Sequence, residues 1–513
     1  MKTAEMRRKR GNSIWRAIVI GLSVLLQVAI IIYFAIWLSS YFVVYQAAMS
    51  ILAIIVIFSI YGKKGNYEYK FRWVLIVAIT PIIGTCLYFL LGEINGSSLI
   101  KKRFAKIKEH TESTLEDKEG VLEGLNEENH DLYGQAYYLQ KFANFPVYKN
   151  TDVKYFGDTC DALESLLKDM ESAEKYIFME YHAIEDATVW HRIERILENK
   201  ASEGVDVRVV FDDIGSMTFI DRSFVRRLRK KNIKCRSFNP MIPVISVFMN
   251  NRDHRKITVV DGKVAHTGGY NIADEYFNFT HPYGEWKDSG VRVEGEAVNS
   301  FIAIFMQIWN VTQRNYENPK DYMLENYKVD GEGYVIPYCD SPLDNDDIGK
   351  DVYLNILKSA KDYVYITTPY LIIDEETKNE IILCAKRGVD IRIVTPGIPD
   401  KKFVYSITRS YYYELAASGV RIYEYTPGFL HAKQFLCDDK IATVGTINLD
   451  FRSLFLHFEN GCLFAGCSAI NDVKADFEQL FEDSKEVTET AKQKAKLSVR
   501  FKRKAVQLLG PLL

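Results

Sequence analysis

Two long uncharged stretches dominate the N-terminal region. Residues 17–62 and 73–92 contain no Asp, Glu, Lys or Arg. A helix needs roughly 20 residues to cross the apolar core of a bilayer, so the first stretch has room for two helices and the second for one. We therefore expect residues 1–94 to form a transmembrane anchor of two or three spans in a multi-pass protein of the cell membrane. The expected spans are at about 17–38, 42–61 and 73–92.

Basic residues do not decide the orientation of this anchor. They precede the first stretch (residues 2–16), occupy the loop at 63–72 and follow the last stretch at 101–108. Positive charge favours the cytoplasmic side, but three spans would place the first two groups and the third on opposite sides. The side of the membrane that carries the rest of the chain stays open.

Beyond a charged segment at 95–145, which has the composition of a linker, strand-like and helix-like patterns alternate. This order is typical of an α/β fold. The strand–helix–strand order at 176–210 recurs at 363–394, and Gly204-Val-Asp-Val-Arg-Val-Val returns as Gly388-Val-Asp-Ile-Arg-Ile-Val. Such a repeat predicts two similar lobes, each a mixed sheet flanked by helices.

The two lobes are expected at 146–325 and 326–490, and each contains the same motif. The motif reads H-x-K-x4-D followed by Gly-Gly-x-Asn or Gly-Thr-x-Asn, at 254–271 and 431–448. Its members are His254, Lys256, Asp261 and Asn271 in the first lobe, and His431, Lys433, Asp438 and Asn448 in the second. One copy is weak evidence, because these are ordinary surface residues. Two complete copies in equivalent lobes predict a shared catalytic site.

The residue types suit phosphodiester transfer without a metal or other cofactor. His and Lys at positions i and i+2 of a strand share one face, and Asp261-Gly262 is a strong hairpin signal. One histidine can attack phosphorus as a nucleophile while the other acts as general acid and then general base. The lysines and the two motif asparagines would bind the substrate phosphate.

A carboxylate behind each imidazole would fix its tautomer. Glu459 follows the second motif and is the candidate partner of His431. Asp288, in Glu-Trp-Lys-Asp, is the candidate partner of His254.

Composition narrows the function further. The formal net charge is −2, which disfavours a nucleic-acid substrate. The eight cysteines are scattered without the spacing of a zinc site or a disulfide framework,.

With these two motifs, the chain resembles the bacterial cardiolipin synthases of the phospholipase D superfamily. Besides the two motifs, the resemblance rests on the hydrophobic N-terminal region, Arg409-Ser-Tyr-Tyr, Tyr423-Glu-Tyr-Thr-Pro-Gly-Phe-Leu-His431, Asn448-Leu-Asp-Phe-Arg-Ser and the terminal Leu-Leu-Gly-Pro-Leu-Leu. The resemblance implies that two phosphatidylglycerols are joined into cardiolipin with release of glycerol, through a covalent phosphohistidine. It implies catalytic roles for the His, Lys and Asp of both motifs, with the first-lobe histidine as nucleophile.

The motifs alone leave other readings open. A hydrolytic phospholipase D and a phosphatidyltransferase with another alcohol acceptor would use the same residues. A nuclease and a catalytically dead membrane scaffold are less consistent with the anchor and the intact motifs. Anionic membrane lipids are the expected partners. The apolar segment 241–249 fits an acyl-chain groove or an ordinary buried loop, and the basic tail at 491–513 fits an anionic membrane surface.

Overall fold

The computed structural model describes most of the chain. The described residues are 18, 21–23, 25–30, 32–33, 42–63, 66–91, 98–221, 223–240, 251–325, 327–344, 346–493, 504 and 506–507. The structure therefore describes only parts of the expected span at 17–38 and of the tail at 491–513, and the apolar segment 241–249 lies wholly outside the described residues.

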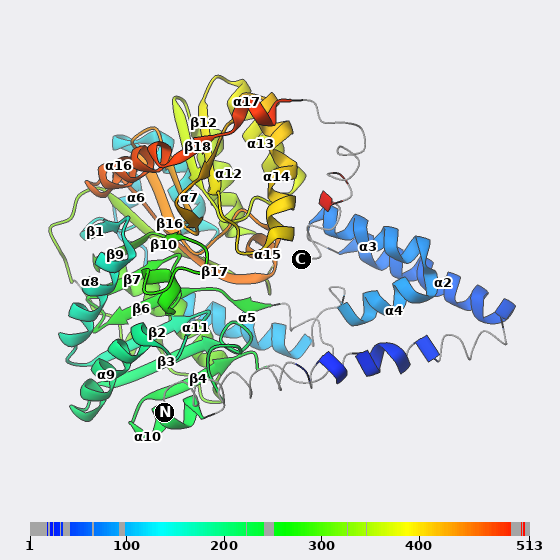
Figure 1. Cartoon of the computed structure of the whole chain (residues 1–513). Helices are drawn as coiled ribbons and strands as arrows, with labels where there is room; N and C mark the ends of the chain where they lie inside the picture. Colours follow the sequence, from blue (N-terminus) through cyan, green and yellow to red (C-terminus); the bar gives the residue numbers. More distant parts are fainter. Residues whose placement is uncertain are drawn as a thin grey trace.

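Two mixed β-sheets form the centres of two lobes, as the internal repeat predicts (Figure 1). The first sheet has the order β1 (Thr151–Phe156), β9 (Gly290–Gly295), β7 (Val264–Gly268), β6 (Lys256–Val260), β2 (Tyr176–Tyr181), β3 (Asp206–Asp212) and β4 (Lys234–Phe238). The second has the order β10 (Tyr334–Asp340), β17 (His457–Ala465), β16 (Ile441–Gly445), β15 (Gln434–Cys437), β11 (Tyr363–Thr367), β12 (Asp390–Pro396), β13 (Arg421–Tyr425) and β18 (Ser484–Glu486). The strands of the two sheets correspond one to one, from β1 and β10 to β4 and β13, and β18 extends the second sheet. The two-lobed α/β fold is therefore confirmed.

Helices cover both sheets because each presents one apolar face. In α9 (Thr188–Ser202), the buried positions include Val189, Ile193, Ile196 and Leu197, which recur at helical spacing,. The other helices of the lobes are α8 (Thr159–Glu171), α10 (Phe224–Lys230), α11 (Val298–Val311), α12 (Ile348–Ser359), α13 (Glu375–Lys386), α14 (Lys402–Ala417), α15 (Phe451–Phe455), α16 (Ala469–Glu482) and α17 (Thr488–Ala491), with 3₁₀ turns η3 (Asp274–Phe277) and η4 (Pro319–Asp321). Buried residues of α11 belong to a core cluster that includes strands of both lobes, so one continuous core joins them.

The segment expected to be a linker forms three packed helices instead. These are α5 (Ser98–Glu112), α6 (Val121–Glu128) and α7 (His130–Lys141). Phe104, Leu125 and Leu139 are at most 2% exposed and belong to the main core. The prediction was wrong because the many charges of this segment lie on the outer faces of amphipathic helices, which bury a sparse apolar stripe.

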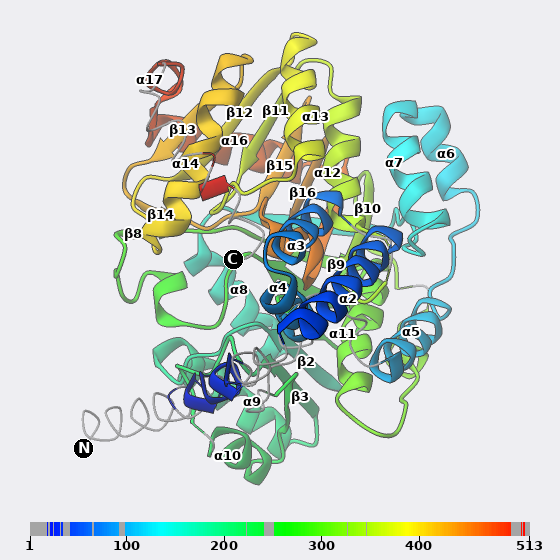
Figure 2. The same ribbon diagram turned by 90° about the vertical axis from the view of Figure 1, so that its right-hand side faces the viewer.

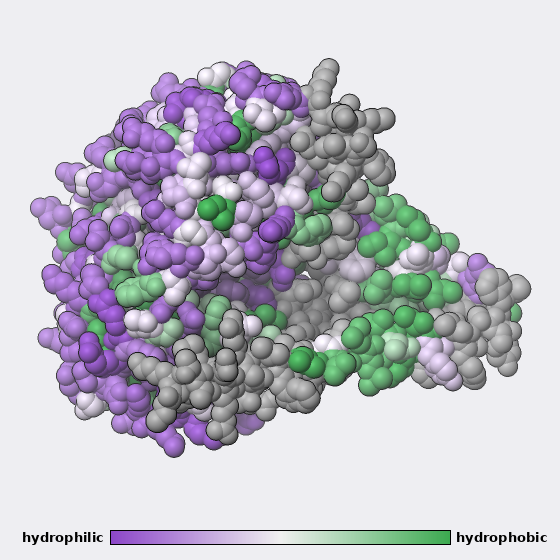
Figure 3. Space-filling view, viewed as in Figure 1, coloured by the Kyte–Doolittle hydropathy of each residue, from purple (hydrophilic) through white to green (hydrophobic). Residues whose placement is uncertain are grey.

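The anchor region forms α2 (Phe42–Gly62), α3 (Tyr67–Ile79) and α4 (Pro81–Leu91), which contact one another beside the lobes (Figure 2). The span expected at 73–92 is not one helix, because the chain breaks at Thr80 and α4 begins at Pro81,. By length and apolar character, no helix among the described residues qualifies as a membrane span. Hydrophobic side chains nevertheless gather on α2–α4, whereas the lobes show a mainly polar face (Figure 3).

Candidate active site

Two short parallel pairings carry strands of one lobe onto the other. β5 (Arg252–Asp253) pairs with the start of β17, and β14 (Gly428–Leu430) pairs with β8 (Glu285–Lys287). Each of β5 and β14 ends just before a motif histidine. The backbone therefore delivers each histidine to the partner lobe, and the two pairings are equivalent under the internal repeat.

His254 is held by the second lobe. Its backbone N–H donates to Phe458 O at 2.8 Å, and its Nδ1 lies 2.9 and 3.0 Å from the two carboxylate oxygens of Glu459. Glu459 is fully buried and the His254 side chain is 10% exposed. This contact fixes the ring and leaves Nε2 for chemistry.

His431 is held in the same way by the first lobe. Its N–H donates to Lys287 O at 2.7 Å, and its Nδ1 lies 2.7 Å from Asp288 Oδ2. The carboxylates are thus exchanged relative to the sequence-based expectation: Glu459 serves His254 and Asp288 serves His431. That pairing was wrong because it kept each acid within its own lobe.

The positions of Asp288 and Glu459 relative to a pair of glycines identify the two acids as equivalent. Gly268 pairs with Gly290 and Gly445 pairs with Gly461 in the two sheets. Asp288 and Glu459 each stand two residues before the second glycine of these pairs. The unequal distance from the motif, which hides the equivalence in the sequence, comes from extra residues between Asn271 and Asp288.

The residue after the motif glycine differs between the lobes, and its size matches the position of the carboxylate beside it. In the second lobe Thr446 Oγ1 donates a short hydrogen bond to Glu459. In the first lobe the equivalent residue is Gly269, and a Cβ there would lie 2.0 Å from Asp288 Oδ1. Glycine therefore makes room for the carboxylate that orients His431.

The side chain of each motif lysine contacts the histidine two residues before it. Lys256 Nζ donates to His254 O at 2.6 Å, and Lys433 Nζ lies 2.6 Å from His431 Nδ1 and donates to the carbonyl oxygen of the same residue. Both ammonium groups are buried, which lowers the pKa of Lys256 to about 8 and that of Lys433 to about 7. A bound phosphate would restore their positive charge.

Both imidazoles are neutral at neutral pH. Burial and then the charge of Lys256 lower the pKa of His254 well below its usual value. Burial and then Lys433 lower the pKa of His431 to about 4. Burial raises the pKa of Asp288, but Lys433 and His431 more than offset this, so the pKa is lower than usual. A neutral imidazole beside an ionised carboxylate is the state that a nucleophile or general base requires.

The motif aspartates lie away from this site, so the catalytic role expected for them is corrected. Asp261 accepts hydrogen bonds from the backbone N–H groups of residues 174–176, each at 2.8 Å. Asp438 accepts from those of residues 361–363 at 2.7–2.9 Å. At about 3.3 Å per residue along β6 and β15, the carboxylates lie roughly 20 Å from the imidazoles. They fasten the predicted hairpin turns to the starts of β2 and β11.

The two motif asparagines differ, because Asn271 makes structural contacts and, among the described residues, the side-chain oxygen of Asn448 does not. Asn271 Oδ1 accepts from Ala183 N at 3.1 Å, and its Nδ2 donates to Tyr276 OH at 2.8 Å. Asn448 is 5% exposed, and within the described residues its Oδ1 has no hydrogen-bond partner. Phosphate binding by these amides stays a prediction.

Sequence reasoning missed the residues that give the two histidines different surroundings. The His254 ring lies 4.9 Å from the His182 ring and 5.4 Å from the His457 ring, measured between centroids. The His431 ring instead lies 5.3–5.8 Å from three aromatic rings, those of Tyr276, Trp286 and Phe429. The three aromatics come from separate positions in the chain, so no local motif marks them.

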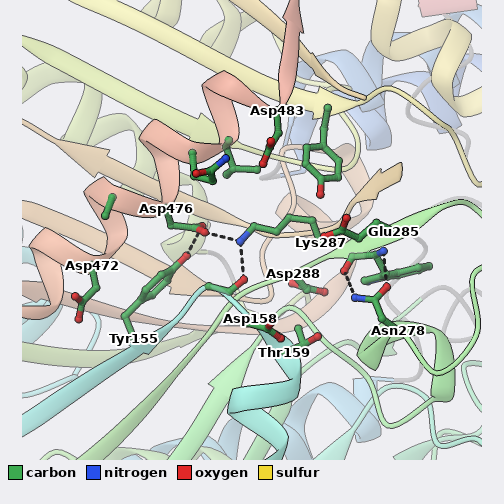
Figure 4. Close-up of a pocket in the computed structure, with 16 residues that line it drawn as sticks. Tyr155, Asp158, Thr159, Asn278, Glu285, Lys287, Asp288, Asp472, Asp476 and Asp483 are labelled. Atoms are coloured by element: carbon green, nitrogen blue, oxygen red, sulfur yellow. Dashed lines mark hydrogen bonds and ion pairs between the residues drawn. The ribbon is translucent and has the colours of Figure 1, made fainter. Parts of the chain in front are cut away.

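A polar cavity of about 600 Å³ lies behind β8 and is lined by residues of both lobes (Figure 4). Lys287 Nζ reaches Asp476 of α16, which also accepts a hydrogen bond from Tyr155 OH at 2.7 Å. Both donors belong to the first lobe and the acceptor to the second. These contacts hold β8, which ends at Lys287 just before Asp288, and so help to place the acid behind His431.

Two clusters of described residues have the spacing of metal ligands. One consists of His254, His457 and Glu459, and the other of Asp186, His191 and Glu194. The groups of the first cluster already contact one another within the site.

A two-lobed α/β fold with a His–carboxylate pair contributed across the lobe interface defines a phospholipase D-type protein. The comparisons agree. Residues 166–309 and 353–481 match the family described as "Cardiolipin synthase, PLD-like domain", and residues 49–93 match "Phospholipase_D-nuclease N-terminal". A crystal structure of phosphatidylserine synthase from Haemophilus influenzae has a similar fold, with a TM-score of 0.56 and 15% identity over 73% of this chain and 98% of the other.

Curated relatives extend the likeness over most of the chain. A cardiolipin synthase of Halalkalibacterium halodurans is 32% identical over 86% of this chain and 88% of its own length. An uncharacterized protein of Streptococcus mutans is 43% identical over 86% of this chain and 96% of its own length. The chain belongs to the family of PLD-like cardiolipin synthases. The prediction of a phosphatidyltransferase is thereby confirmed at the level of the family.

Proposed function

We propose that the protein is a cardiolipin synthase that transfers a phosphatidyl group from one phosphatidylglycerol to another. The observation that supports this best is the pair of neutral histidines, each oriented through Nδ1 by a buried carboxylate of the opposite lobe. Two such groups over two lysines are what a two-step transfer at phosphorus requires.

In the first step, Nε2 of His254 attacks the donor phosphorus. A P–N bond forms, the P–O bond to glycerol breaks, and His431 gives a proton to the departing alkoxide. In the second step, His431 takes a proton from the acceptor hydroxyl, whose oxygen attacks phosphorus as the P–N bond breaks. Lys256 and Lys433 balance the charge of the phosphate in both steps.

His431 must be protonated for the first step, although its pKa in the empty site is about 4. The donor phosphate raises this pKa, because its negative charge pairs with Lys433, whose positive charge lowers the pKa of the imidazole in the empty site. Glu459 would stabilise the cationic form of His254, and Asp288 would stabilise that of His431.

The hydrophobic helices α2–α4 fit a membrane anchor that places the lobes beside their lipid substrates. We infer a multi-pass attachment to the bacterial cell membrane from the uncharged stretches of the sequence and from the exposed apolar side chains of α2, which include Ile51, Ile55 and Phe58. The choice of phosphatidylglycerol as donor and acceptor rests on the resemblance to the bacterial cardiolipin synthases, whereas the names of the relatives give only cardiolipin as the product.

The test supplies the purified protein with phosphatidylglycerol carrying a labelled phosphate and follows the products. Cardiolipin and free glycerol in equal amounts support the proposal, whereas phosphatidic acid as the main product would indicate a hydrolase. His254→Ala and His431→Ala should each abolish turnover. His191→Ala, at a histidine whose side chain is 60% exposed, is the matched control and should not. Trapping of labelled phosphate on His254 after acid-free quenching would identify the nucleophile.

A further inference from the structure

One face of α5 and the C-terminal end of α11 form a groove of about 820 Å³. Among the described residues no carboxylate lines it, since the exposed Glu109 of α5 lies outside the lining. Its basic side chains are those of Lys102, Arg103, Lys106 and His110 of α5 and Arg314 of the loop after α11. We call this feature the basic groove. None of these residues belongs to the active site, so a ligand here would be separate from the reacting phosphate.

The positive charge of the basic groove is not balanced within the part of the chain that the structure describes. Lys102, Lys106 and Arg314 are exposed, and no described carboxylate forms an ion pair with them. Lys108, on another face of the same helix, is instead paired with Asp344 at 3.0 Å. Neighbouring cations without a counter-charge repel one another, so a bound anion would lower the electrostatic energy of the groove.

A fixed guanidinium and an apolar surface complete the basic groove. Arg103 donates to Asn310 O at 3.4 Å, so its charge is held at the C-terminal end of α11. Ile107 adds an apolar contact to the lining, and the Tyr316 ring lies 5.5 Å from the His110 ring, measured between centroids. Cations beside apolar and aromatic surface are suited to a ligand that is anionic at one end and apolar at the other.

The basic groove follows the proposed membrane anchor closely in the chain. α4 ends at Leu91 and α5 begins at Ser98, and an extended chain of this length spans at most about 25 Å. A bilayer carries a layer of headgroups outside its apolar core. The basic groove is therefore within reach of the lipid headgroups beside the anchor, where negative phosphates are concentrated.

On the basis of the membrane attachment in the proposed function, we propose that the basic groove binds the headgroup of an anionic phospholipid beside the anchor. Arg314 can donate two hydrogen bonds to phosphate oxygens, and Lys102 and Lys106 contribute point charges. This lipid is not converted. Because α11 belongs to the core that joins both lobes, a lipid bound against its end fixes the orientation of the lobes relative to the bilayer.

The test counts the lipids that the full chain retains. Protein with His254→Ala, which removes the proposed nucleophile and so prevents turnover, is titrated with phosphatidylglycerol in micelles of a neutral detergent and measured by native mass spectrometry. The further changes Lys102→Gln, Lys106→Gln and Arg314→Gln together should remove one tightly retained phosphatidylglycerol and weaken its apparent affinity about 10- to 100-fold. Phosphatidylcholine, which has no net charge, should bind the parent and the groove variant equally weakly. An excess of inorganic phosphate should not displace the retained lipid.

A matched control removes the same charge elsewhere, at three exposed lysines of the lobes: Lys168→Gln, Lys175→Gln and Lys386→Gln. This control should retain as much phosphatidylglycerol as the parent, and the unfolding midpoints of both triple variants establish that they are folded. Equal retention by the parent and the groove variant would overturn the assignment, as would an equal loss in the control. Displacement by inorganic phosphate would overturn it in favour of a free-phosphate site. A wild-type protein that forms no cardiolipin would instead contradict the proposed function, because lipid retention is measured without turnover.

Discussion

Replacing Asp288 by asparagine tests the exchange of carboxylates between the lobes. The wild-type carboxylate is fully buried and 2.7 Å from His431 Nδ1. The amide keeps the shape but removes the charge, and it can present an N–H where Nδ1 needs an acceptor. The imidazole would then carry its proton on Nε2, which is the wrong tautomer for a general base.

The magnitude follows from two contributions. A hydrogen bond to a buried charged group contributes about 1.5–3 kcal/mol, which corresponds to roughly a 10- to 150-fold change in rate. The tautomer adds to this, since the same substitution behind a catalytic histidine of a serine protease costs about 10⁴-fold. We expect Asp288→Asn to lower kcat by about 10²- to 10⁴-fold with little change in the unfolding midpoint.

The assay combines turnover with proton NMR of the histidine ring N–H groups. In the wild type, the Nδ1 protons of His254 and His431 should both give hydrogen-bonded signals, assigned with single His→Ala variants. Asp288→Asn should remove only the His431 signal, and Glu459→Gln only the His254 signal. Partners within each lobe would give the opposite result, and retention of more than about a tenth of wild-type kcat would contradict the reasoning.

Another buried His–Asp pair provides the matched control. His266 of β7 is fully buried, and its Nε2 lies 2.6 Å from Asp169 Oδ2 of α8. Asp169→Asn makes the same chemical change at a buried histidine. It should lower stability and leave kcat unchanged.

Three further outcomes are expected. Asp261→Asn should lower the free energy of unfolding by about 1–3 kcal/mol, because it weakens three backbone contacts, while the folded fraction keeps its kcat; a specific loss of kcat would contradict the structural role. Gly269→Ala should displace Asp288 and reduce kcat, whereas Gly134→Ala, with nothing within 4 Å, should leave kcat unchanged and stabilise α7 by about 0.5–1 kcal/mol. Since the Lys433 ammonium has a pKa of about 7 and binds phosphate only when protonated, kcat/KM for the donor should fall as pH rises through this value; a flat profile well above it would exclude this lysine as the controlling group.

The motif chemistry could be predicted from the sequence because its determinants are local. His254 precedes β6 and Lys256 begins it, and Asp261-Gly262 forms the expected hairpin, with φ of 52° and 72°. The two-lobed fold could be predicted because the repeat is long and in the same order. These features depend only on the spacing of residues along one segment.

The features that could not be predicted from the sequence depend on contacts between distant segments. The pairing of β5 with β17 sets which acid meets His254, and no pattern within either strand encodes it. The same holds for α5, whose Phe104 ring packs 5.1 Å from the Phe458 ring, although its charged faces resemble a linker. The role of Asp261 was misread because its partners are backbone N–H groups, which leave no trace in residue identity.

The crosswise arrangement explains why both copies of the motif are needed. A single lobe would present a histidine without the carboxylate that orients it, since Glu459 and His254 belong to different lobes. Each lobe thus completes the other, and the core that contains α11 keeps their relative position fixed. Within this near-symmetry, His254 has imidazole neighbours and His431 has aromatic ones. Equal histidines in unequal surroundings differ in the ease with which they hold a proton. The duplication supplies two copies of one group, and their different surroundings fit the proposed division of roles into a nucleophile and an acid/base.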